Sequence, residues 1–205
     1  MVATLKRHMM KTVGLLLLLA MYSGAACQSR QQPFKGLKNE AMIQTLKQFP
    51  DKAARWNVPA ADGRLLYDII TENNYHKVLE VGTSNGYSAM WMSYALKETD
   101  GKLITLEINE ERADEARTNL GDAGLDAIAE VRTTDALEEI PNLQGTFDLV
   151  FLDANKSGYA DYYRMIKEQL EPGGAIAAHN VLTMEYAMKD FLDAIRSDAN
   201  FTVEI

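Results

Sequence analysis

The sequence predicts a single α/β domain with a doubly wound, mainly parallel sheet. Short apolar runs alternate with longer segments in which apolar residues recur every three or four positions. This alternation is typical of βαβ units, whose crossovers are right-handed. The chain has 205 residues, of which 47% are hydrophobic, enough for one compact domain with a proper core.

The elements follow one another in a regular order. Helical spacing predicts two helices first, over 37–49 and 60–74. The predicted strands are 77–81, 102–108, 127–133, 147–153, 175–181 and 201–205, and the helices between them are 86–98, 110–124, 159–170 and 184–195. Gly124 ends one of these helices, and Pro172-Gly173-Gly174 stops another. In such sheets a ligand lies beyond the carboxyl ends of the strands, so we expect the chemistry there.

The N-terminus has the tripartite form of a secretory signal. Lys6, Arg7 and Lys11 precede an apolar run over 13–22, and small residues fill 23–26. The run is shorter than the about 20 residues that span a bilayer. Small residues directly before Cys27 resemble the lipobox of bacterial lipoproteins, in which this cysteine is acylated, although Gly24 stands where leucine is usual.

We therefore expect residues 1–26 to be a lipoprotein signal, 28–36 a tether and 37–205 the folded domain of an exported, membrane-anchored protein. Two alternatives stay open. Ordinary cleavage after Ala26 would give a soluble exported protein, and initiation at Met21 would leave the protein in the cytoplasm.

Charge and cysteine content exclude several classes of function. The only charged residues of 1–26 are Lys6, Arg7 and Lys11, so the remaining 18 basic and 29 acidic residues give the rest of the chain a net charge of −11. A body this acidic repels nucleic acid and anionic lipid headgroups. Cys27 is the only cysteine, which excludes an internal disulfide and a cysteine-based zinc site.

The first predicted strand ends in the stretch LEVGTSNGYS, which carries Gly82 and Gly86. This spacing allows a tight turn and a close approach of a ligand to the backbone. Ser84 and Tyr87 occupy the second and third glycine positions of the dinucleotide fingerprint, so NAD and FAD are disfavoured.

Two acids complete a candidate nucleoside site. Glu80 precedes the first glycine and suits a ligand with a positive centre and amino groups. Glu107 ends the second strand, where an acid binds both ribose hydroxyls. Together with the glycine turn they predict S-adenosylmethionine as the ligand. The alternative is a glycine turn beside two solvated carboxylates.

Two further strand ends carry candidate metal ligands. Asp153 ends the strand over 147–153 and Lys156 follows it, while His179 and Asn180 end the next strand. Carboxylate, imidazole and amide oxygen make three ligands and leave room for a chelating substrate. Lys156 is a candidate base for a hydroxyl whose pKa the cation lowers. The alternative is an acid that caps a helix and a histidine satisfied by hydrogen bonds.

From about Trp56 to Leu182 the chain resembles the cation-dependent, catechol-type O-methyltransferases, including the bacterial and caffeoyl-CoA branches. The matching stretches are NVPAADGRLL, KVLEVGTSNGYSAMWM, LITLEINEERADEARTNL, TTDALEEIP, FDLVFLDANKSGYADYY and LEPGGAIAAHNVL. The resemblance implies a Rossmann-like, class I methyltransferase fold. It also implies methyl transfer to one hydroxyl of a vicinal pair on an aromatic ring, and it suggests a homodimer.

The resemblance also implies roles for individual residues. The positions implied to contact the cofactor, with Gly86 of the glycine turn, are Val58, Glu80, Gly82, Ser84, Gly86, Ser88, Glu107, Asp135, Ala136 and Asp153. Asp153, His179 and Asn180 match the metal positions, and Lys156 matches the catalytic base.

The chain departs from the family in three places. His179 stands where the family has aspartate, which should weaken Mg²⁺ more than Mn²⁺, Fe²⁺, Co²⁺ or Zn²⁺, or abolish the metal site. The family usually continues into another, antiparallel strand after the position of Ile205; without it the last strand would be an exposed edge, or the sequence is a fragment. The export signal is foreign to the family, and S-adenosylmethionine is made in the cytosol.

The sequence therefore predicts an S-adenosylmethionine-dependent, divalent-metal-assisted O-methyltransferase acting on a small catechol-like or phenolic substrate. Two other hypotheses remain. One is a catalytically impaired lipoprotein that binds a nucleoside or S-adenosylmethionine. The other is a metal-independent methyltransferase that uses Lys156 or another base.

Overall fold

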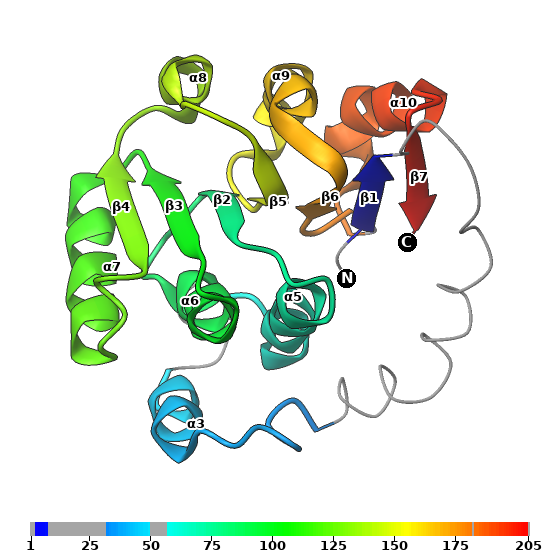
Figure 1. Ribbon diagram of the computed structural model, residues 1–205. Coiled ribbons are helices and arrows are strands. Elements are labelled where there is room, and N and C mark those ends of the chain that lie inside the picture. Colours follow the sequence, from blue (N-terminus) through cyan, green and yellow to red (C-terminus); the bar gives the residue numbers. More distant parts are fainter. Residues whose placement is uncertain (1–2, 8–31, 50–56, 182, 205) are drawn as a thin grey trace.

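The computed structural model describes residues 3–7, 32–49, 57–181 and 183–204. A seven-stranded sheet runs through the molecule in the order β4-β3-β2-β5-β6-β1-β7 (Figure 1). Five neighbouring strands pair in parallel: β4 (Ala129–Thr133), β3 (Lys102–Glu107), β2 (Lys77–Val81), β5 (Phe147–Leu152) and β6 (Leu170–Ala178). The predicted parallel, doubly wound sheet is confirmed.

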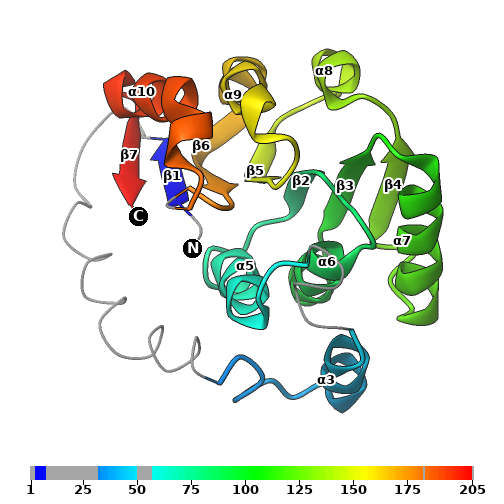
Figure 2. The ribbon, with the colours of Figure 1, turned by 180° about the vertical axis from the view of Figure 1, so that it is seen from behind.

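Helices cover both faces of the sheet, as Figures 1 and 2 show from opposite sides. One face carries α5 (Ala60–Glu72), α6 (Tyr87–Thr99) and α7 (Glu110–Asp122), and α3 (Glu40–Lys47) contacts α6 from outside. The other face carries α8 (Ala136–Glu139), α9 (Tyr159–Ile166) and α10 (Lys189–Ser197). Short 3₁₀ turns are Ile140–Asn142, Lys156–Gly158, Lys167–Gln169 and Glu185–Met188. Each face buries its own apolar cluster against the sheet.

Two predicted boundaries are wrong around Pro172. The helix predicted over 159–170 ends at Ile166 and continues as a 3₁₀ turn, and β6 begins at Leu170, five residues earlier than predicted. The register of β6 against β5 shifts between the pairs Phe147–Leu170 and Leu149–Ala175. Residues 171–174 therefore form an irregularity within β6. The strand can continue through them because proline and glycine are tolerated at bulges.

The N-terminal strand β1 (Ala3–Arg7) was not predicted. It lies between β6 and β7 (Phe201–Glu204) and is antiparallel to both. The sequence pattern assigned these residues to the basic start of an export signal. In the structure they form an antiparallel strand inside the sheet. Cys27 and the rest of the predicted signal lie outside the described residues.

Part of the predicted tether contacts the domain. Arg64 Nη1 donates to the carbonyl oxygens of Pro33 and Lys35 at 3.1 and 2.8 Å. The ring of Phe34 stacks on that of Trp91 with centroids 5.5 Å apart. Residues 33–35 are thereby attached to α5 and α6.

Helices α5 and α6 approach each other closely at Gly63. A Cβ atom on Gly63 would lie 2.4 Å from Cδ1 of Trp91, which is fully buried. We expect Gly63→Val to lower the free energy of unfolding by about 2–3 kcal/mol, because the added side chain overpacks this contact. Urea unfolding measures the change.

Gly121 provides the matched control, since it is also helical but has no atom within 4 Å of a built Cβ. Gly121→Ala should raise the free energy of unfolding by about 0.5–1 kcal/mol through helix propensity. Equal effects of the two substitutions would contradict a role for close packing at Gly63.

Candidate active site

The loop over 82–86 connects β2 to α6 at the carboxyl end of the sheet. The amides of Gly82 and Thr83 donate to the carbonyl oxygen of Leu106 at 2.9 and 3.3 Å. Gly82 has a φ of +101°, and a Cβ there would lie 2.6 Å from the carbonyl oxygen of Asp153. Only glycine allows this approach. The loop is therefore held against the ends of both β3 and β5.

Glu80 lies on β2 directly before this loop and is fully buried. Its carboxylate accepts hydrogen bonds from the hydroxyls of Ser88 and Thr105, the latter at 2.5 Å. Burial raises the pKa of Glu80 to about 8, although both hydrogen bonds act to lower it. A buried carboxyl of this kind suits a ligand that brings positive charge.

The raised pKa of Glu80 has a consequence for stability. Because its folded pKa of about 8 exceeds the unfolded value of 4.5, the folded chain binds the extra proton between these pH values. The free energy of unfolding should therefore fall as pH rises from about 4.5 to 8. Glu80→Gln, which cannot ionise, should flatten this part of the profile in thermal melts without ligand. An unchanged slope would show that Glu80 does not titrate in this window.

Glu107 ends β3 and is oriented by two backbone amides. Its Oε2 accepts from the Ser84 amide at 2.8 Å and its Oε1 from the Asn109 amide at 3.0 Å. A carboxylate oxygen has two acceptor lone pairs, so each oxygen keeps one for a ligand hydroxyl. Glu107 thus keeps acceptor capacity on both oxygens, and its role in binding the ribose hydroxyls stays a prediction.

The remaining positions of the glycine turn also carry unusual geometry. Ser84 has a φ of +51°, a conformation that is strained for serine and concentrated at functional sites. Gly86 has a φ of +88° at the start of α6. The side-chain Nδ2 of Asn85 is buried without a hydrogen-bond partner among the described residues, which leaves a donor in this loop.

The other predicted cofactor residues lie around the same edge of the sheet. The amide of Thr134 donates to the Glu107 carbonyl at 2.9 Å, which joins the end of β4 to that of β3. Asp135 follows and caps α8 through the Leu137 amide at 2.8 Å. Ala136 is buried in the first turn of α8, and Val58 is buried just before α5.

Asp153 and Lys156 meet at the end of β5. Lys156 Nζ lies 2.7 Å from Asp153 Oδ1 and 3.0 Å from the hydroxyl of Tyr159. The Tyr159 hydroxyl in turn donates to the Leu152 carbonyl at 2.7 Å, and burial raises its pKa. The Lys156 side chain is only 12% exposed, so its ammonium group has a restricted position.

His179 follows β6, and its amide donates to the Leu152 carbonyl at 3.0 Å. Its ring Nδ1 lies 3.1 Å from Asp153 Oδ1, so the structure brings these two predicted metal ligands together. The other ring nitrogen, Nε2, lies 3.2 Å from Oδ2 of Asp62. Asn180 comes next with a φ of +63° and accepts from the amides of Thr183 and Met184 through its carbonyl oxygen.

Asp62 is a site residue that the sequence analysis missed. It lies in the first turn of α5, where a carboxylate interacts favourably with the helix dipole. Burial acts to raise the pKa of Asp62, but the hydrogen bond with His179 and further interactions outweigh it, so the pKa lies below its usual value. Asp62 lies in the stretch NVPAADGRLL, which contributed only to the family resemblance. An acid at the start of a helix is common, so it does not by itself indicate a functional site.

The four side chains of Asp62, Asp153, Lys156 and His179, here called the strand-end cluster, lie in contact with one another. Oδ1 of Asp153 and Nδ1 of His179 are 3.1 Å apart, a separation that two neighbouring ligands of one cation can have. Both ring nitrogens of His179 face carboxylate oxygens, and Asp153 Oδ1 also contacts Lys156. Within the described part of the chain, no group of three or more His, Cys, Asp or Glu residues is placed to hold a metal ion.

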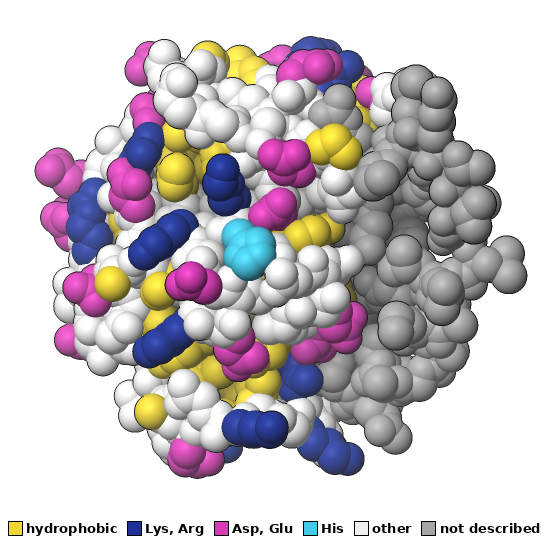
Figure 3. Space-filling model, in the orientation of Figure 1, with side chains coloured by type: hydrophobic (Ala, Val, Ile, Leu, Met, Phe, Trp, Pro, Cys, Tyr) yellow, Lys and Arg dark blue, Asp and Glu magenta, His cyan; other side chains and the backbone are white. Residues whose placement is uncertain are grey.

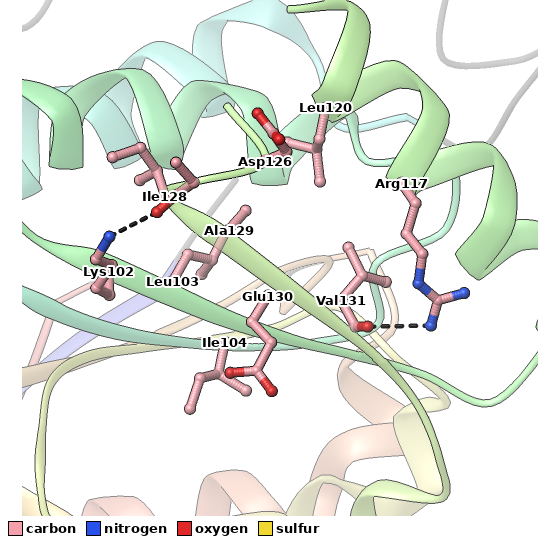
Figure 4. Close-up of a pocket in the computed structure, with 11 residues that line it drawn as sticks. Lys102, Leu103, Ile104, Arg117, Leu120, Asp126, Ile128, Ala129, Glu130 and Val131 are labelled. Carbon is pink, nitrogen blue, oxygen red and sulfur yellow. Dashed lines mark hydrogen bonds between the residues drawn. The ribbon is translucent and has the colours of Figure 1, made fainter. Parts of the chain in front are cut away.

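A separate hollow of about 600 Å³ lies at the outer edge of the sheet (Figure 4). Its wall is formed by α7, β4 and the first residues of β3, and the Arg117 guanidinium donates to the Val131 carbonyl at 3.0 Å. None of the predicted site residues lines it. It lies outside the strand-end region where such sheets bind ligands.

The described surface carries charged side chains of both signs. On the face shown in Figure 3, basic and acidic side chains are intermixed and form no continuous basic stripe. A continuous basic surface is the usual footprint of nucleic-acid binding. In the described ranges, no helix has both the length and the apolar character needed to cross a membrane.

The parallel sheet, the glycine loop and the acids at the ends of β2 and β3 define a Rossmann-like, class I methyltransferase fold. The chain belongs to the O-methyltransferase family, whose family model matches residues 34–200. The resemblance stated from the sequence is therefore confirmed.

Individual relatives agree with this assignment. The chain is 39% identical over 109 residues to a catechol O-methyltransferase of Niastella koreensis, covering 51% of this chain and 49% of that protein. It is 34% identical over 126 residues to a catechol O-methyltransferase of Mycobacterium tuberculosis, covering 61% and 57%. The chain thus aligns with about half the length of these curated relatives.

A solved structure extends the similarity over most of the fold. The O-methyltransferase TomG from Streptomyces achromogenes, in complex with S-adenosylmethionine, superposes with a TM-score of 0.70 at 25% identity. The match covers 84% of this chain and 85% of that one.

Proposed function

We propose that this chain transfers the methyl group of S-adenosylmethionine to a hydroxyl oxygen of a small phenolic or catechol-like substrate. The observation that carries the proposal is the arrangement of Glu80, Glu107 and the 82–86 loop directly beside Asp153 and Lys156. The relatives named catechol O-methyltransferase and the structure with bound S-adenosylmethionine support it.

The residues divide into two groups by role. Glu107 would hold the ribose hydroxyls, and Glu80 would meet the positively charged part of the cofactor. The substrate hydroxyl oxygen attacks the methyl carbon, the carbon–sulfur bond breaks, and its electron pair stays on sulfur. The hydroxyl proton leaves to a base, for which Lys156 is the candidate once it has lost its own proton. Catalysis then depends mostly on positioning and charge.

Dependence of the reaction on a divalent cation is a further, more specific part of the proposal. Its support is the match of Asp153, His179 and Asn180 to the family's metal positions at two adjacent strand ends. The metal-independent form of the same reaction is the alternative, which turnover in the presence of a chelator would support. A metal, if bound, would supply charge that favours the ionised substrate hydroxyl.

One experiment tests the function with the full chain. Isothermal titration measures S-adenosylmethionine binding, and mass spectrometry follows methylation of a panel of catechols and phenols with and without chelator. Binding together with methylated product supports the proposal. Absence of cofactor binding would contradict it. The homodimer suggested by the resemblance stays a prediction, which light scattering of the same sample tests.

Export of the chain is proposed on the N-terminal pattern alone, with Cys27 as the acylation site. Strand β1 lies inside the proposed signal, so cleavage before Cys27 would remove the partner that lies between β6 and β7. Intact-mass analysis with membrane fractionation tests this. Acylated Cys27 at the N-terminus supports export, and a soluble chain that retains residues 3–7 contradicts it.

A further inference from the structure

Three consecutive residues of β3 hold the loop that follows β2, each through a different group. The hydroxyl oxygen of Thr105 lies 2.5 Å from that of Thr83, whose amide donates to the Leu106 carbonyl at 3.3 Å. The carboxylate of Glu107 accepts from the Ser84 amide at 2.8 Å. Side chains two positions apart on a strand lie on one face of the sheet, so both side-chain contacts are made from the same face.

The same hydroxyl of Thr105 also contacts Glu80. These two residues are partners in the register of β2 and β3, so their side chains are neighbours on one face of the sheet. The Thr105 hydroxyl donates to Oε2 of Glu80 at 2.5 Å, and the Ser88 hydroxyl donates to Oε1. Glu80 and Thr105 are fully buried and Thr83 is 1% exposed, so solvent does not compete for these bonds.

A hydroxyl group is suited to join two partners at once. It has one proton to donate and lone pairs with which to accept. While Thr105 donates to Glu80, its oxygen can accept from the hydroxyl of Thr83. If Glu80 binds a proton, both bonds can reverse their direction and the same two contacts persist. The bridge from Glu80 to Thr83 therefore does not depend on the charge of Glu80.

We propose that Thr105 is a positioning residue for cofactor binding, whose hydroxyl orients Glu80 towards the positively charged part of S-adenosylmethionine and ties it, through Thr83, to the loop. This role rests on the proposed function. Because the amide of Ser84, next to Thr83, donates to Glu107, one hydrogen-bonded chain joins the residue proposed for the charged part of the cofactor to the residue proposed for its ribose.

Calorimetric titration of the full chain with two ligands tests the role of Thr105. S-adenosylmethionine is compared with methylthioadenosine, which has the nucleoside but neither the amino-acid part nor the positive charge. Thr105→Val keeps the shape of the side chain and removes the hydroxyl. It should weaken S-adenosylmethionine binding about tenfold or more, the effect of losing a hydrogen bond to a charged group. Methylthioadenosine affinity should stay within about threefold, because the loop keeps its backbone bonds to Leu106. Thr105→Ser, which retains a hydroxyl, should recover most of the S-adenosylmethionine affinity.

Thr99→Val is the matched control. Thr99 is also a buried threonine, and its hydroxyl donates to the Tyr75 carbonyl at 2.7 Å at the far end of α6. Both ligands should bind this variant as they bind the wild type. Equal losses for both ligands in Thr105→Val would show that Thr105 supports the loop alone, and they would overturn its role through Glu80. Wild-type affinity for S-adenosylmethionine in Thr105→Val would overturn it as well.

The carboxyl group of Glu80 gives a readout that needs no ligand. Burial raises the pKa of Glu80 to about 8, against the hydrogen bonds from Ser88 and Thr105 and together with the charges of Asp153 and Glu107 on the neighbouring strands. Carbon NMR of protein labelled at its glutamate carboxyl groups follows the titration, with the signal assigned by Glu80→Gln. Thr105→Val should raise the midpoint by about one pH unit, since the charged form loses a hydrogen bond. Thr105→Ser should titrate as the wild type does.

The outcomes separate this role from the proposed function. Failure of the wild type to bind S-adenosylmethionine refutes the function, while the titration of Glu80 still tests its contact with Thr105. An unchanged midpoint in Thr105→Val, with a thermal melt showing that the variant is folded, refutes the positioning of Glu80 by Thr105 and leaves the function standing.

Discussion

Lys156→Met is expected to lower kcat by about 10²–10⁴-fold, the usual contribution of a positioned acid–base group. Methionine keeps the length of the side chain but removes the group that contacts Asp153 Oδ1 and the Tyr159 hydroxyl. Because Lys156 is not among the residues that hold the cofactor, the Kd for S-adenosylmethionine should stay within about threefold. Methyl-transfer kinetics at saturating cofactor, together with calorimetric titration, measure both quantities.

The matched control is Lys97→Met, which changes an exposed lysine in the last turn of α6. Its kcat and cofactor affinity should equal those of the wild type. A Lys156→Met enzyme with kcat within about threefold of the wild type would show that another group removes the proton. A parallel loss of cofactor affinity would instead assign Lys156 to binding.

Glu107→Ala is expected to weaken S-adenosylmethionine binding by about 10²-fold or more. Two hydrogen bonds from ribose hydroxyls to a charged acceptor are lost, each worth about 1.5–3 kcal/mol. The amides of Ser84 and Asn109 also lose their acceptor, so the 82–86 loop loses part of its support. Calorimetric titration measures the Kd, and a thermal melt checks that the variant is folded.

Two comparisons make this result specific. Glu107→Gln keeps the side-chain shape and should fall between wild type and Glu107→Ala. Asp122→Ala removes an exposed acid at the far end of α7 and should bind the cofactor normally. Wild-type affinity in a folded Glu107→Ala would contradict the assignment of Glu107 to the ribose.

The central part of the fold could be predicted because its signals are local. Strands β2, β3 and β5 are short apolar runs, and the helices between them have regular apolar spacing. The region of Pro172 could not be predicted, because the same residues that end a helix also form bulges within strands. Strand β1 was missed because five residues with two basic side chains carry no strand signal until β6 and β7 are in place.

The candidate site also combines residues that the sequence predicts with contacts that only the folded chain shows. The sequence by itself determined the chemical types at the strand ends, Glu80, Glu107, Asp153 and Lys156, since parallel strands align their carboxyl ends along one edge of the sheet. Only the tertiary structure decided what His179 does. Its partner Asp62 lies 117 positions away in sequence, and a contact over that separation depends on how α5 packs against α6, which no local pattern encodes. His179, which the sequence marks as a weakened metal ligand, lies in the folded chain with Nδ1 beside Asp153 and Nε2 beside Asp62.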